Sequence, residues 1–194
     1  HIVLVDRPAA DVSAPLVASD TAPAITELVD HLVATGRREI GMISGPEQAG
    51  TTRERVAALR DALAAHELQL RSDRLWVGDY RRESGRELMK EMLDEGTTPQ
   101  ALLVGNGRMA LGVLETLSSY PAVVPQLARD LALAAIDDLE VFPLVHPSIT
   151  AIEQPSREMG RQAFTSLLAR MGGHDVGSVR LPCTLRLRES TDPR

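Results

Sequence analysis

The stretch LLVGNGRMALGV, residues 102–113, joins a short apolar run to a helical pattern through Gly105, Asn106 and Gly107. The run at residues 101–104 contains only Ala, Leu and Val, and the residues after Gly107 resemble the start of a helix. Glycine on both sides of a single amide is typical of a tight connection between two elements. The stretch therefore predicts a buried strand followed by a helix, with Asn106 at the carboxyl end of the strand.

The same alternation of strand and helix continues along most of the chain. Helical patterns with one apolar face occupy residues 25–33, 51–66 and 82–95, and Gly36 provides a stop after the first. They lie between apolar runs at residues 2–5, 39–43, 75–77, 101–104 and 131–136. Runs that are apolar at nearly every position are typical of parallel strands covered by helices on both faces, so the sequence predicts the α/β class.

The pattern changes after Asp138. Residues 139–156 contain three prolines and only a short extended run, ITAI, which indicates a connector between substructures. We expect a further helix at residues 157–171 and a final extended segment at residues 179–190. The chain opens on a strand-like run without Met, so we expect its natural start, and any targeting signal, to lie upstream of His1.

The composition allows a sizeable core and argues against several classes of function. Hydrophobic residues make up 43% of the 194 positions, and there is no apolar stretch of about 18 residues that could span a membrane. A formal charge of −6 does not suit a nucleic-acid surface, because phosphate binding needs clustered Lys and Arg. Cys183 is the only cysteine and the histidines are scattered, so we expect no disulfide, metal or other cofactor. The sequence lacks a GxSxG elbow and a P-loop, so we expect no catalytic residue.

Polar side chains stand at four junctions where a predicted strand leads into the next segment. Because the carboxyl ends of parallel strands line one crevice, these side chains are candidates for a shared site. Hydroxyl, guanidinium, phenol, amide and carboxylate groups together suit a polyhydroxylated or heterocyclic small ligand. The candidates are Thr51, Arg55, Tyr80, Asn106, Asp137 and Asp138.

Each candidate also has a purely structural interpretation. Asn106 could be a turn residue in a left-handed backbone or the cap of the next helix. Either aspartate of the pair could cap a turn, and Arg55 could be an exposed helix residue with a weak ion-pair partner. Tyr80 could pack on the rim, and Thr51 could be the N-cap of its helix. The residue types alone leave these alternatives open.

Taken together, these stretches resemble the effector-binding domain of the LacI family of bacterial transcriptional repressors. The resemblance covers essentially the whole chain, and its pieces follow in the family's order. They are VLVDR (3–7), HLVATGRREIGMISGP (31–46), the spacing Arg53-x-Arg55, GDYRRESGRELM (78–89), NGRMALGVLETL (106–117), IDD (136–138), ITAIEQPSREMGRQAFTSLL (149–168) and LPCTLRLRES (181–190).

The resemblance implies a periplasmic-binding-protein-like I fold: two doubly wound parallel-sheet subdomains joined by three hinge crossovers. Residues 1–37 and 153–176 would form the N-terminal subdomain, and residues 38–152 and 177–194 the C-terminal one. The DNA-reading headpiece, the hinge helix and the first part of the N-terminal subdomain would lie upstream of the chain, leaving that subdomain incomplete here.

The resemblance also assigns roles at the site. Positions matching Arg55, Asn106 and Asp137 hydrogen-bond the effector in the family, and those matching Tyr80 and Thr51 line the pocket. The family usually has Asn-Asp where this chain has Asn-Gly, and Gly-aromatic-Asp-Asp where it has Ala-Ile-Asp-Asp.

The expected function is allosteric sensing of a small molecule, a sugar first and a nucleoside-like compound second. The regulator would be a cytoplasmic homodimer that binds operator DNA only through the missing headpiece, with no membrane partner. Two alternatives stay open: a solute-binding protein of a transport system, and an enzyme on a doubly wound fold with Asp137 or Asp138 as general base.

Overall fold

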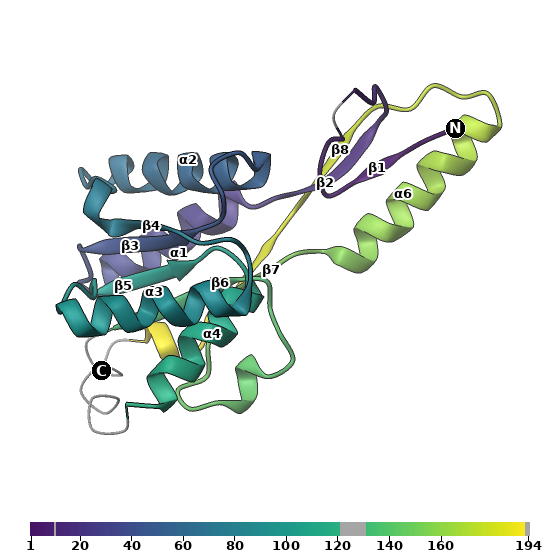
Figure 1. Ribbon diagram of the computed structural model, residues 1–194. Coiled ribbons are helices and arrows are strands. Elements are labelled where there is room, and N and C mark those ends of the chain that lie inside the picture. The colour runs from purple at the N-terminus through teal and green to yellow at the C-terminus, as the bar shows by residue number, and fades with distance from the viewer. Residues whose placement is uncertain (10, 121–130, 193–194) are drawn as a thin grey trace.

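Two sheets of unequal size organise the chain (Figure 1). The computed structural model describes residues 1–9, 11–120 and 131–192. The six-stranded sheet has the order β4-β3-β5-β6-β7-β9, and the three-stranded sheet has the order β1-β2-β8. Both are parallel except for the edge pair of β7 and β9, so the predicted α/β class is confirmed.

The large sheet contains the strands that four of the five apolar runs predict, and the run at residues 2–5 belongs to the small sheet. Every residue of its central strands β3, β5 and β6 is buried, which explains why these runs are apolar at nearly every position. The strand that follows the predicted connector also pairs here, next to β6. The strands are β3 (Ile40–Ser44), β4 (Leu75–Val77), β5 (Ala101–Val104), β6 (Ala132–Ile136), β7 (Thr150–Glu153) and β9 (Thr184–Arg186).

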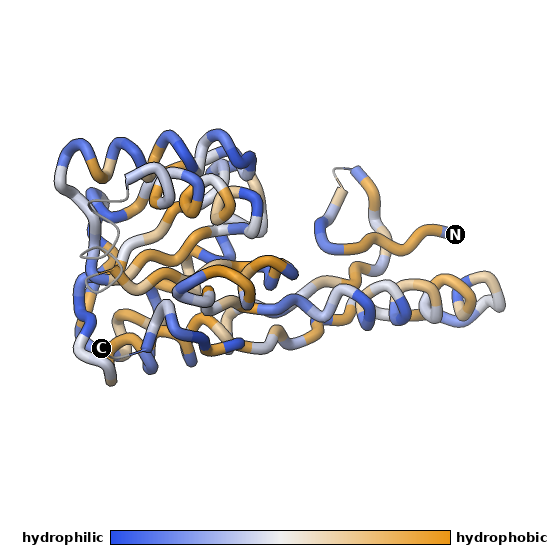
Figure 2. Tube along the Cα trace, turned by 90° about the horizontal axis from the view of Figure 1, so that it is seen from below, coloured by the Kyte–Doolittle hydropathy of each residue, from blue (hydrophilic) through white to orange (hydrophobic). Residues whose placement is uncertain are grey.

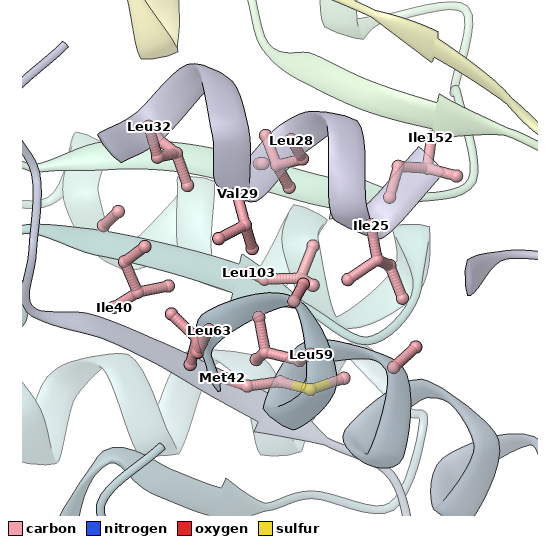
Figure 3. Packing of buried hydrophobic residues seen from close by; sticks show 14 of the residues in the cluster. Ile25, Leu28, Val29, Leu32, Ile40, Met42, Leu59, Leu63, Leu103 and Ile152 are labelled. Carbon is pink, nitrogen blue, oxygen red and sulfur yellow. The ribbon is translucent and has the colours of Figure 1, made fainter. Parts of the chain in front are cut away.

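Helices cover both faces of the large sheet. On one face, the apolar sides of α1 (Ala22–Ala34) and α2 (Gly50–Ala65) pack on the strands in one cluster. Figure 3 shows Ile25 and Leu28 of α1 and Leu59 of α2 in this cluster. On the other face, α3 (Arg82–Glu95) and α4 (Gly107–Ser118) form a second cluster with the same strands. The large sheet is therefore doubly wound, as expected.

The small sheet has a much thinner core. It consists of β1 (Leu4–Val5), β2 (Leu16–Asp20) and β8 (Val179–Pro182), and α6 (Ser156–Met171) packs against β1 and β2. Figures 1 and 2 show this part extending away from the large sheet, with α6 beside the N-terminal strands. Its cluster of buried apolar residues contains only Val17, Met159 and Ala163.

The described chain passes between the two sheets at three places, the number that the family resemblance implies. The passages lie between β2 and α1, between β7 and α6, and between β8 and β9. At the last one the backbone N–H of Cys183 donates to the carbonyl of Asp20 at 3.0 Å. The passage after β7 also lies near the first one, because Ser19 Oγ donates to Gln154 Oε1 at 2.6 Å, so the three passages meet at the seam between the sheets (Figure 1).

The structure moves two of the expected subdomain boundaries. The division after residue 37 comes too late, because α1 buries its apolar face on the large sheet. The division before residue 177 comes too early, because β8 pairs with β2 of the small sheet before the chain returns. Residues 121–130 and 193–194, which fall inside the expected C-terminal subdomain, lie outside the described residues.

The predicted connector is also corrected. Most of residues 139–156 stays with the large sheet, since Phe142 and Ile149 are buried in its second cluster. Only the short piece between β7 and α6 crosses to the small sheet. Within the described ranges, no helix combines the length and apolar character that crossing a bilayer requires.

Candidate functional site

A polar pocket of about 180 Å³ lies at the seam between the sheets. The five residues for which the sequence predicts effector contacts all line it, although they come from four separate junctions. Three further residues complete the lining: two from the end of β1 and one from the passage after β7. The full set is Asp6, Arg7, Thr51, Arg55, Tyr80, Asn106, Asp137 and Gln154.

Asn106 is the N-cap of α4, which explains the amide between two glycines at the end of β5. Its backbone is extended, with φ −159°, so the left-handed alternative is wrong and the cap alternative is right. Its Oδ1 accepts from the N–H of Met109 at 2.9 Å, and its Nδ2 donates to the carbonyl of Tyr80 at 3.0 Å. A Cβ at Gly105 would lie 2.8 Å from the carbonyl of Ile43, and one at Gly107 would lie 2.9 Å from Leu139. The residue before the amide must therefore be small, because backbone lies against it, whereas a side chain at position 107 would require Leu139 to move.

Asp137 directly follows β6, and its hydrogen bonds connect this strand to β7 and to α4. Its own N–H donates to the carbonyl of Ile152 at 3.0 Å, which ties it to β7. Its Oδ2 accepts from the N–H of Gly107 at 3.1 Å, at the start of α4, and its Oδ1 accepts from Gln154 Nε2. The carboxylate is held in one orientation beside the pocket, and it also supplies the negative charge that the N-terminus of α4 favours.

Asp138 has a different role from its neighbour. It forms a two-point ion pair with Arg188, with N–O distances of 2.8 and 2.6 Å, and both side chains are largely buried. It is absent from the polar pocket and lines an adjoining hollow of about 610 Å³ that shares Asp137 and Gln154 with that pocket. A carboxylate held in this way by a guanidinium is poorly suited to act as a general base.

Arg55 is almost completely buried, with 6% of its surface exposed, so the exposed-helix alternative is wrong. Its Nη1 donates to the carbonyl of Gly105 at 2.8 Å, which joins α2 to the end of β5. Among the described residues, no carboxylate forms an ion pair with it. A buried cation bonded only to a carbonyl is an effective donor for a ligand oxygen.

Tyr80 and Thr51 form the next part of the wall. The Tyr80 hydroxyl lies 2.7 Å from Thr52 Oγ1 and 3.4 Å from Thr51 Oγ1. Its ring covers Gly45, where an added Cβ would lie 2.0 Å from the ring. Ala49 occupies the N-cap position of α2, so the alternative that Thr51 is the cap is wrong.

The backbone at this pocket is unusual. Asp6, Tyr80 and Asp137 all have left-handed φ values, 70°, 67° and 73° respectively. Among the described residues, only Asp11 and Glu67 are further non-glycine examples. Such conformations persist where surrounding contacts enforce them, and they concentrate at functional sites. Their coincidence at one pocket marks it as the candidate site.

Sequence reasoning missed Asp6, Arg7 and Gln154. Asp6 and Arg7 follow the apolar run 2–5, so the rule applied to the other strand ends would have found them. Gln154 directly follows β7, a strand interpreted as part of a connector. It joins the two sheets, because Ser19 Oγ of β2 donates to its Oε1 at 2.6 Å while its Nε2 donates to Asp137.

The nearby thiol does not add reactive chemistry. Burial raises the pKa of Cys183 to about 11, so it stays protonated near neutral pH. In the described parts of the chain, no group of three or more His, Cys, Asp or Glu residues is arranged to hold a metal ion. The site offers hydrogen-bonding groups and an aromatic ring.

Comparison with known proteins gives a consistent family. Residues 29–191 match the model of the periplasmic binding protein-like domain. The HTH-type transcriptional regulator PtxS of Pseudomonas aeruginosa is 34% identical over 100% of this chain, which covers 56% of that protein. The HTH-type transcriptional repressor CytR of Escherichia coli K12 is 30% identical over 98% of the chain and 55% of its own length. The chain thus spans about half the length of these relatives.

Solved structures agree with this assignment. A complex of the transcriptional regulator CelR with cellobiose superimposes with a TM-score of 0.83 at 28% identity, over 97% of this chain and 58% of that one. A sugar-binding transcriptional regulator of the LacI family from Escherichia coli, complexed with phosphate, gives 0.81 at 25% identity, over 97% and 67%. The chain belongs to the periplasmic binding protein-like domain family, and it corresponds to the effector-binding part of LacI-type transcriptional regulators.

Proposed function

We propose that the pocket at the seam binds the small-molecule effector of a LacI-type transcriptional repressor. The observation that carries this proposal is the convergence of side chains from both sheets on one pocket. Arg55, Asn106 and Asp137 approach it from the large sheet, and Asp6 and Arg7 approach it from the small sheet. A ligand bound there would contact residues of both sheets at once.

The chemistry of the lining favours an uncharged polyhydroxylated ligand. The two cations and two carboxylates balance formally, and Arg7 pairs with Asp6 at 3.2 Å. Carboxylates and amides accept and donate bonds to neighbouring hydroxyls, the guanidinium of Arg55 donates, and Tyr80 offers a ring edge or face. We propose a sugar or sugar derivative as effector, with a nucleoside-like compound second. The cellobiose found in the CelR complex supports the first choice.

The proposed mechanism is a shift between two arrangements of the sheets. Asn106 and Asp137 already use their polar atoms within the protein, so ligand hydroxyls would share or replace those bonds. Binding across the seam then favours one arrangement, by no more than the difference in affinity for the two arrangements. We propose that the protein acts as a cytoplasmic homodimer. In the dimer, this change would alter how the DNA-binding parts, which are not included in this chain, are positioned on operator DNA.

The observations favour this function over the two alternatives. The relatives are named as transcriptional regulators, which supports a sensor over a transport protein. For the enzyme alternative, Asp138 is held by Arg188 and Asp137 by Gly107 and Gln154, so neither has the free position that a general base requires. We therefore propose binding without turnover.

A thermal-shift screen of sugars and nucleosides on the full-length protein tests the proposal. A specific ligand at a hundredfold excess over its dissociation constant should stabilise the protein by about 2.7 kcal/mol. Asp137→Ala should abolish the shift while the protein stays folded by circular dichroism. Asp61→Ala, an exposed position on α2, is the matched control and should keep the shift. A full shift retained in Asp137→Ala would remove this pocket from consideration.

A further inference from the structure

One ion pair joins the two sheets directly beside the proposed effector pocket. Arg180 lies in β8 of the small sheet, and Glu54 lies in α2, which packs on the large sheet. Below, each sheet together with the helices packed on it is called a body. The guanidinium donates twice, from Nη1 to Oε2 at 3.0 Å and from Nη2 to Oε1 at 2.8 Å. This two-point geometry fixes both the distance and the orientation of the two elements.

The pair borders the same cleft as the polar pocket. Glu54 and Arg180 line a hollow of about 230 Å³ that shares Asp6, Thr51 and Arg55 with that pocket. Glu54 also directly precedes Arg55 in α2, so neighbouring residues of one helix turn serve the ion pair and the pocket. Any movement of β8 relative to α2 therefore affects both.

The charges around the pair favour its ionised form. The bonds from Arg180 and the nearby guanidiniums of Arg53 and Arg55 hold the pKa of Glu54 below its ordinary value. Glu54 raises the pKa of the Arg180 guanidinium, and the charge of Asp20 raises it further. Both side chains are about half exposed, so the attraction between them is sensitive to salt.

Other ion pairs of the same chemistry lie within one body. The pair of Arg82 and Glu115 is also two-point and half exposed, but it joins α3 to α4 on the same face of the large sheet. Breaking it cannot release one sheet from the other. It therefore provides a matched reference for the effect of removing a surface charge.

We propose that Glu54 and Arg180 are positioning residues that hold the two walls of the effector cleft in the closed arrangement. The effect of this closure on ligand binding rests on the proposed function, since a closed cleft is the form in which both walls contact one ligand. Surface ion pairs are weak individually, so removal should raise the ratio of open to closed molecules about two- to fivefold.

Distance measurement between two spin labels tests this without any effector. Nitroxides at Thr165→Cys on α6 and Glu91→Cys on α3, both exposed positions, report the separation of the bodies in a Cys183→Ser background. Excess unlabelled protein suppresses distances between molecules. Pulsed electron paramagnetic resonance should give one main distance in this background and an enlarged longer component in Glu54→Gln.

The controls separate a positioning role from a general loss of stability. Arg180→Gln should reproduce the longer component, and the exchanged pair Glu54→Arg with Arg180→Glu should reduce it again. High salt should act like Glu54→Gln, and Glu115→Gln should leave the distribution unchanged. Distributions of folded Glu54→Gln and Arg180→Gln that superimpose on the background would overturn the proposal. Because the readout uses no effector, its outcome is independent of the ligand screen.

Discussion

The two sheets of this chain differ in how much apolar surface supports them. The large sheet is packed on both faces by helices, whereas the small sheet buries little more than Val17, Met159 and Ala163 beneath one helix. Hydrophobic burial is the main source of stability, so within the described chain the large sheet should carry most of the stability. The proposed effector pocket takes side chains from both, which places binding at the boundary between the two sheets.

The largest effect is expected from a cavity in the large sheet. Leu103, in the central strand β5, is 1% exposed, and Leu103→Ala should lower the free energy of unfolding by about 2–5 kcal/mol. Val17→Ala in the small sheet removes two buried methyl groups, an expected loss of about 1.5 kcal/mol. Urea denaturation followed by circular dichroism measures both. An equal or larger loss in Val17→Ala would contradict the unequal weight of the two sheets.

A smaller effect is expected where the large sheet meets the pocket. Gly45→Ala places a methyl group 2.0 Å from the Tyr80 ring, so the ring must move, at a cost of about 1–3 kcal/mol. Effector affinity should fall with it, because Tyr80 lines the pocket. Gly160→Ala is the control: α6 has open space there, and the change should stabilise its helix by about 0.5–1 kcal/mol. Equal stabilities of the two variants would show that the Tyr80 ring is not fixed over Gly45.

The cap of α4 should contribute less again. Asn106→Ala removes the acceptor for the Met109 N–H and the donor to Tyr80, with an expected loss of about 0.5–2 kcal/mol. Asn106→Ser keeps a capping oxygen and should recover most of this stability without restoring the bond to Tyr80. Thermal denaturation of the three proteins compares them. A stability of Asn106→Ala equal to that of the native protein would show that the side chain is free for ligand alone.

The smallest effect concerns the ion pair between the bodies. The pKa of Glu54 is lowered from 4.5 in the folded protein, so its contribution is present above pH 4.5 and is lost as pH falls through the folded pKa. The stability difference between the native protein and Glu54→Gln, below about 1 kcal/mol for an exposed pair, should therefore be constant from pH 7 to 5 and decrease as the pH falls through the folded pKa of Glu54, which lies below 4.5. A difference that grows toward acid pH would contradict the assignment.

The sequence predicts the large sheet better than the small one, for a physical reason. Strands β3, β5 and β6 are buried on both faces, so each reads as a continuous apolar run. The strands of the small sheet are partly exposed. The segment LVASD of β2 ends in two polar residues, so its pattern did not predict a strand. The family resemblance implied three crossovers, but their positions depend on where α1 and β8 find partners, which is tertiary information.

The candidate site follows the same division. Strand ends in the large sheet identified Arg55, Asn106 and Asp137, because an apolar run that stops at a polar residue is visible in the sequence. Their bonding is not visible there: Asp137 is held by Gly107 and Gln154, which are distant in sequence. Gln154 was missed because β7 is short and lies among prolines, so its strand end was hidden.

Hydrogen exchange measured by mass spectrometry, with and without the sugar identified in the screen, tests the central claim most directly. Binding across the seam predicts simultaneous protection of the backbone around Asp6, Asn106 and Asp137, on both sheets. Protection confined to the apolar hollow lined by Leu114, Leu131 and Ile149 would place the ligand within the large body and contradict the account.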